Sequence, residues 1–174
     1  MILSLFRKST ATDQVFAVYS AIVAQSRQPR FYAEWGVPDT VTGRFDMISL
    51  HLALLLRRLK GESVEARRFS QSLFDLFFRD MDRSLREMGA GDLGVPKKIQ
   101  KMGNIFYGLL ASLDAALSAN DAAAVEAVLQ RNVYGGEPIA GSRDLATYLL
   151  AESRRLAGES TTSLMTARGT GAAA

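Results

Sequence analysis

Apolar residues recur every three or four positions along most of the chain, which is the spacing of one face of an α-helix. The pattern is clearest between residues 62 and 88, where charged residues occupy the opposite face. The apolar stripe there consists of Phe69, Leu73, Phe77, Met81, Leu85 and Met88. No stretch alternates apolar and polar residues as a half-buried strand would. The sequence therefore predicts an all-α fold, a single compact helical domain of about six to seven helices.

The segment from Arg44 to Leu59 differs from the other expected helices, because apolar residues surround its axis on nearly all sides. A helix of that kind is usually buried. We expect it to be the central element of the domain. His51 lies inside it, and we interpret His51 as a buried, neutral histidine with one hydrogen-bond partner.

Capping residues and prolines predict where the other helices begin and end. Thr10-Ala11-Thr12-Asp13 indicates the start of the first helix, and Pro29 indicates its end. Pro96 suits the first turn of a helix that runs to about residue 120. Asp121 and Ser142 are expected to cap two further helices.

The 174 residues suggest one domain. We place it at residues 10–157, after a flexible N-terminal segment, residues 1–9. From residue 158 to residue 174 the chain consists mainly of Ser, Thr, Gly and Ala. Such a segment buries little apolar surface, so we expect a disordered C-terminal tail.

Composition favours a cytoplasmic protein. The hydrophobic fraction of 48% and charged fraction of 22% are ordinary for a globular domain, and no window has the roughly 20 apolar residues that span a bilayer. The first eight residues place their basic pair after a short apolar stretch, which is the reverse of a secretory signal. Peripheral contact with the inner face of the cytoplasmic membrane stays open.

Residues with catalytic or metal-binding chemistry are few. The chain has no cysteine and one histidine, His51, which excludes disulfides, thiolate metal sites and any multi-histidine site within one chain. Nucleotide-binding and hydrolase motifs are also missing from the sequence. We expect no catalytic residue, no cofactor and no metal, and hence no enzyme. A well-formed pocket converging on His51 beside a perturbed carboxylate would reverse that expectation.

Basic residues gather at one predicted helix start. Lys97, Lys98 and Lys101 lie where the helix dipole is already positive, so nearby acidic residues such as Asp92 must balance them or an anionic partner must bind there. The net charge of +3 is compatible with either reading. The partner would be an acidic protein, a phosphate backbone or lipid headgroups.

Phe31, Tyr32 and Trp35 form an aromatic group with two interpretations. In a short helix Phe31 and Trp35 would lie side by side, and most such groups belong to a core. The alternative is a partly exposed apolar groove for a hydrophobic client. Flexible methionines would make that groove adaptable, and the candidates are Met81, Met88 and Met102.

Several segments, in this order and spacing, resemble the ubiquinol-cytochrome c chaperone family. They are FYAEWGVPDTVTGRFD at residues 31–46, FDLFFRDMDRSLREMG at residues 74–89, GDLGV with KKIQKM within residues 91–102, and FYG at residues 106–108. The resemblance covers roughly residues 10–155. Mitochondrial members of that family bind newly made cytochrome b, assist assembly of ubiquinol–cytochrome c reductase and associate with the ribosomal tunnel exit.

The resemblance implies a bacterial assembly chaperone with cytochrome b as its client. A ribosome or an anionic membrane surface would be a further partner, and no DNA is expected. The residues expected to contact the client are Phe31, Tyr32, Trp35, Arg79, Arg86, Lys97, Lys98 and Lys101. The alternative is a peripheral membrane- or RNA-surface-binding module without a protein client, in which the three lysines do the binding.

Overall fold

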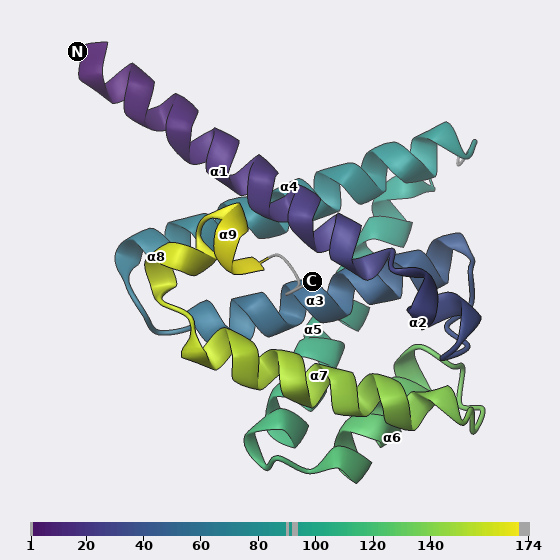
Figure 1. The fold of residues 1–174 in the computed structure, drawn as a ribbon. Helices are drawn as coiled ribbons and strands as arrows, with labels where there is room; N and C mark the ends of the chain where they lie inside the picture. The colour runs from purple at the N-terminus through teal and green to yellow at the C-terminus, as the bar shows by residue number, and fades with distance from the viewer. Residues whose placement is uncertain (1, 90, 92–93, 171–174) are drawn as a thin grey trace.

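The computed structural model describes residues 2–89, 91 and 94–170, with side chains described from residue 11 to residue 169 of these ranges. Every regular element in them is a helix, which confirms the predicted all-α fold (Figure 1). The elements are α1 (Ile2–Ser26), α2 (Pro29–Ala33), α3 (Val41–Leu59), α4 (Val64–Glu87), α5 (Val95–Ser118), α6 (Ala122–Asn132), α7 (Gly141–Gly158), α8 (Thr161–Leu164) and α9 (Ala167–Thr170).

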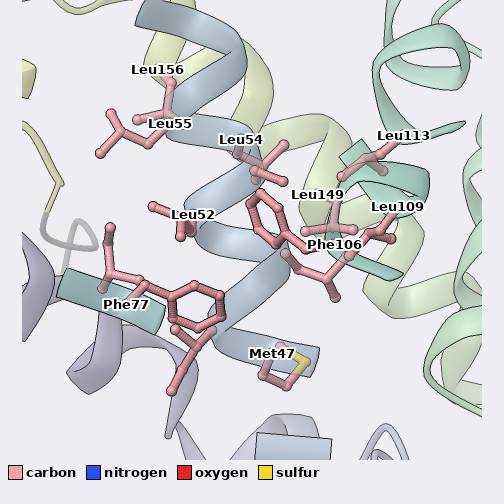
Figure 2. Packing of buried hydrophobic residues seen from close by; sticks show 14 of the residues in the cluster. Met47, Leu52, Leu54, Leu55, Phe77, Phe106, Leu109, Leu113, Leu149 and Leu156 are labelled. Atoms are coloured by element: carbon pink, nitrogen blue, oxygen red, sulfur yellow. The ribbon is translucent and has the colours of Figure 1, made fainter. Parts of the chain in front are cut away.

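Helix α3 is the centre of the domain, as its apolar sequence predicts. It contacts α1, α4, α5 and α7, and it lies between them in Figure 1. Figure 2 shows Phe77 of α4, Phe106 of α5 and Leu149 of α7 in the cluster built around α3. The side chains of Met47, Leu50 and Leu52 have no exposed surface. Burying apolar side chains from four neighbours on one helix supplies most of the folding free energy.

Helices α4 and α5 form an antiparallel pair. The rings of Phe74 and Tyr107 have centroids 5.6 Å apart, while Phe78 lies beside Gly103, one turn further along α4 and one turn earlier on α5. Phe77 points the other way and stacks on Phe45 of α3 at 5.2 Å. One face of α4 therefore joins the core while a neighbouring face follows α5.

The N-terminal segment differs from the prediction. Residues 1–9 were expected to be flexible, with a helix starting near Thr10. Instead α1 begins at Ile2 and runs without a break to Ser26, and its first turns extend beyond the rest of the domain in Figure 1. The reason is local: no proline or glycine precedes Pro29, so polar residues continue the helix rather than cap it.

The C-terminal region also differs from the prediction over residues 158–170. Ser160 caps α8 by accepting a hydrogen bond from the backbone N–H of Ser163, and Leu164 has no exposed surface. Arg155 donates to the carbonyl of Gly169 over 3.0 Å. The buried Leu164 and these local hydrogen bonds therefore hold the segment in place, although its composition resembles that of a disordered tail. Residues 171–174 of the expected disordered tail lie outside the described residues.

Candidate functional site

Phe31, Trp35, His51 and Tyr148 form a closed aromatic cluster. The Phe31 ring has no exposed surface, and its centroid lies 5.4 Å from that of Trp35, 5.7 Å from His51 and 5.1 Å from Tyr148. The Arg30 guanidinium lies over three of these rings at 5.1–5.3 Å, where cation–π attraction holds it. Phe31 and Trp35 are side by side as predicted, but they belong to the core.

Hydrogen bonds fix the tautomer of His51. Its Nδ1 lies 2.7 Å from the carbonyl oxygen of Met47, so Nδ1 must carry the proton. Its Nε2 lies 2.8 Å from the Tyr148 hydroxyl and accepts from it, while Gln25 Nε2 donates to the same hydroxyl oxygen over 2.8 Å. His51 is thus buried as predicted, with two partners rather than one. These bonds link α1, α3 and α7.

The surroundings of His51 favour its neutral form. Burial lowers its pKa, although the Met47 carbonyl opposes that shift. Burial would raise the pKa of nearby Glu152, but hydrogen bonds and charge from Arg155 outweigh it and lower the pKa. The cavity between them has a volume of about 10 Å³, which is space for about one water and not for a substrate.

A second aromatic group lies at the surface, along the α4–α5 pair. Phe74 contacts Phe78 at 4.6 Å and Tyr107 at 5.6 Å between centroids. Tyr107 is 58% exposed, while the two phenylalanines are half-buried. We call Phe74, Phe78 and Tyr107 the α4–α5 surface. It is an apolar strip open to solvent.

The three predicted lysines lie on the same helix as Tyr107, nearer its N-terminus. Lys97, Lys98 and Lys101 are all exposed on the first turns of α5, and none forms an ion pair with a described residue. Gly94, the N-cap of α5, has no side chain with which to cap the helix. Asp92, the expected counter-charge, lies outside the described residues. The first turns of α5 therefore expose positive charge.

The structure separates the residues that the sequence grouped as one contact site. Phe31 is buried, Trp35 is half-buried beside it, and the Tyr32 hydroxyl donates to the carbonyl of Ser26 over 2.8 Å. Arg79 lies on the side of α4 that faces α1. Arg86 bonds Asp82 over 2.7 Å near the C-terminal end of α4. Of these residues, only the lysines lie on the same helix as the exposed Tyr107.

The methionines expected to line a groove do not form a group either. Met81 is buried, Met102 is half-buried and Met88 is 52% exposed. The α4–α5 surface was not predicted from the sequence. Its signals were the i, i+4 pair of Phe74 and Phe78, and Tyr107 directly after the inward-facing Phe106.

Asp46 on α3 is the one strongly perturbed carboxyl among the described acidic residues. Burial raises its pKa to about 7, and no described residue gives it a hydrogen bond or an ion pair. The described residues contain no group of His, Asp and Glu that could hold a metal ion. A lone carboxyl without a nucleophile or a substrate cavity has no catalytic geometry.

The chain belongs to the ubiquinol-cytochrome c chaperone family. Residues 33–170 match the model of that family. A solved structure, the crystal structure of the Cbp3 homologue from Brucella abortus, is 46% identical, with a TM-score of 0.86 over 97% of this chain and 94% of that one. The fold and the family agree, and the family is one of assembly chaperones rather than enzymes.

Two curated relatives are more distant. The ubiquinol-cytochrome-c reductase complex assembly factor 1 of Xenopus laevis is 22% identical over 67% of this chain and 58% of its own length. The protein of the same description from Mus musculus is 23% identical over 60% of this chain and 35% of its own length. The chain thus spans between a third and three fifths of these relatives. Among its described helices, none has the length and apolar character needed to cross a membrane.

Proposed function

We propose that this protein is an assembly chaperone of the cytochrome bc complex and that its client is newly made cytochrome b. The support is membership of the ubiquinol-cytochrome c chaperone family, together with two relatives described as assembly factors of the ubiquinol–cytochrome c reductase complex. A client of that complex before insertion offers apolar helix faces and charged loops to a helper protein.

The observation that carries the proposal is the α4–α5 surface. An open aromatic strip can cover an apolar client helix without rearranging the core, because Tyr107 is already exposed. Lys97, Lys98 and Lys101, nearer the N-terminus of the same helix, would attract acidic client loops. We assign client contact to these three lysines and Arg86, and a supporting role inside the fold to Phe31, Tyr32 and Trp35.

The place of action that we propose is the cytoplasmic side of the membrane. Exposed lysines are attracted to an anionic bilayer and to ribosomal RNA, and either surface would bring the protein to a client as it is made. Both contacts would be weak and salt-dependent, since the charges involved lie in solvent.

Crosslinking in native cells tests the proposal. Tagged protein is captured and cytochrome b is measured for the native chain, for Lys97→Glu/Lys98→Glu/Lys101→Glu, and for a control with the same change of charge, Arg67→Glu/Arg68→Glu/Arg131→Glu. The control residues are exposed, and none of them lies on α5. We expect capture by the native chain and the control and a loss in the lysine variant. No capture by the native chain at normal abundance contradicts the client assignment.

The unpartnered lysines also favour the alternative, a membrane- or RNA-surface-binding module without a protein client. In that case the lysine variant would lose binding to anionic vesicles or RNA, binding would fall steeply with salt, and Tyr107→Ala would leave that binding unchanged. A chaperone that covers apolar client helices should instead lose client capture on Tyr107→Ala, in high salt as in low.

A further inference from the structure

A groove between α1 and α4 is separate from the α4–α5 surface. Its volume is about 630 Å³, within the range of binding clefts. On α1 it follows one helical stripe, Phe16, Ser20, Ala24 and the following Arg27, and on α4 it follows Leu76, Arg79, Asp80 and Arg83, with Tyr19 and Val23 between them. The two helices thus provide parallel rows of residues on either side of an open channel.

The charges in the groove are unbalanced. Asp80 is engaged within it, because the Tyr19 hydroxyl donates to it over 2.9 Å and Arg83 over 2.6 Å. Arg27 and Arg79 form no ion pair or side-chain hydrogen bond with a described residue. Two guanidinium groups therefore point at the groove with their donors unused, and such groups match carboxylates well.

The groove also has an apolar component. Phe16 is 49% exposed at one end, and Val23 and Leu76 line the interior. Ser20 and Ala24, one turn apart, are too small to fill the space between the helices. An occupant that uses both components needs apolar side chains on one face and acidic ones beside them, which an amphipathic helix supplies at i, i+3 and i+4 spacing.

We propose that the α1–α4 groove docks an acidic amphipathic helix of a partner protein, as a second binding site distinct from the client surface. An anionic lipid would pair its headgroup with Arg27 and Arg79 and lay an acyl chain on Val23 and Leu76, whereas a helix repeats both kinds of group along the rows that line the groove. An acidic helix satisfies both, so it is the occupant the groove fits. Because Phe74 and Phe78 lie on a different face of α4, both sites can be occupied at once.

Fluorescence anisotropy with a labelled synthetic peptide tests this site. The peptide has about 18 residues, long enough to form a helix on binding, with leucines on one face and glutamates beside them. Its control is a scrambled peptide of the same composition. We expect Arg27→Glu/Arg79→Glu to weaken peptide binding at least about tenfold, whereas the exposed pair Arg67→Glu/Arg68→Glu leaves it within about twofold.

A second variant changes shape without charge. Ala24→Trp fills the groove and should weaken the peptide by a similar factor, while Ala115→Trp, on the exposed face of α5, should not. Equal binding of the acidic and scrambled peptides would overturn the proposal. So would phosphatidylglycerol vesicles that bind through Arg27 and Arg79 when the peptide does not.

Client capture separates this site from the proposed function. Arg27→Glu/Arg79→Glu should still capture cytochrome b, and the lysine variant should still bind the peptide. If the arginine variant loses client capture as well, the groove is part of the client surface and the second site is refuted. The peptide measurement itself does not require cytochrome b to be the client.

Discussion

Two aromatic groups with the same sequence spacing have opposite environments in this protein. Phe31 and Trp35 are four positions apart and lie in the closed cluster, under Tyr148 of α7 and beside His51 of α3. Phe74 and Phe78 are also four positions apart, yet they lie in a strip that ends in the exposed Tyr107. Only the second group offers a surface to a partner.

The difference comes from what covers each pair. The closed cluster is covered by a helix from the far end of the sequence, and its polar atoms are paired through His51, Tyr148 and Gln25. Among the described residues the open strip is covered by α5, which carries a glycine, Gly103, beside Phe78. Two aromatic residues four positions apart therefore predict that both lie on one face of a helix. Whether that face is buried or exposed depends on which other helix packs against it.

The largest effect should follow removal of the ring at the centre of the closed cluster. Phe31→Ala leaves a cavity among Trp35, His51 and Tyr148, and should lower the free energy of unfolding by about 3–5 kcal/mol. Urea unfolding monitored by circular dichroism measures it. A loss below about 1 kcal/mol would mean that the cluster is not closed in solution.

The next effect comes from a single hydroxyl. Tyr148→Phe removes the group shared by His51 Nε2 and Gln25 Nε2. It leaves His51 Nε2 buried without a partner and Gln25 Nε2 with only its longer bond to Glu152, over 3.4 Å, and should cost about 1–3 kcal/mol. Tyr107→Phe, which removes an exposed hydroxyl from the open strip, is the matched control and should be nearly neutral. Equal losses in the two variants would contradict the contrast between the groups.

A pH series should show the closed cluster titrating. Burial lowers the pKa of His51 in the folded state, so below about pH 6.5 the unfolded state binds a proton at His51 that the folded state does not. Burial also raises the pKa of Asp46 to about 7, so Asp46 acts in the opposite direction and adds stability as pH decreases. His51→Gln should be less stable at neutral pH, but it keeps the Asp46 contribution alone and should gain more stability than the native chain as pH decreases from about 7 to about 5.5. The difference between the two curves isolates His51, and parallel curves would contradict its titration.

The smallest effect on stability should come from the open strip. Tyr107→Ala removes a side chain that is 58% exposed and should change the free energy of unfolding by about 0.5 kcal/mol or less. The same variant should reduce capture of cytochrome b, if the α4–α5 surface binds the client. Unchanged capture would assign the strip a purely structural role.

The sequence predicted the helices well because their signals are local. Residues 44–59 have apolar side chains on nearly all sides of the helix axis, and this pattern identified the buried helix α3. Asp121 caps α6 by accepting from the backbone N–H groups of Ala123 and Ala124, as expected. Ser142 was wrong as a cap: it lies inside α7, where its hydroxyl donates to Glu126 over 2.7 Å. A serine near a helix start can either cap the backbone of its own helix or bond a side chain of a neighbouring helix. Here Glu126 of α6 accepts the bond.

The candidate site was less predictable, because it depends on which helices are neighbours. Nothing in the local sequence of Phe31 shows that Tyr148 covers it, since 117 positions separate them in the chain. Arg79 was grouped with the lysines as a basic residue, but helical geometry turns it towards α1. Residue types and helical periodicity could be taken from the sequence. Which other helix packs against each aromatic pair could not.

The hydrogen bond between Gln25 and Tyr148 has a consequence for the order of events during synthesis. Its partners are 123 positions apart, so the closed cluster cannot be completed until α7 has emerged from the ribosome. The α4–α5 pair needs only residues 64–118 and can form earlier, because contacts between neighbours in sequence form first. The strip that we assign to the client would thus take shape while the chain that carries it is still being translated.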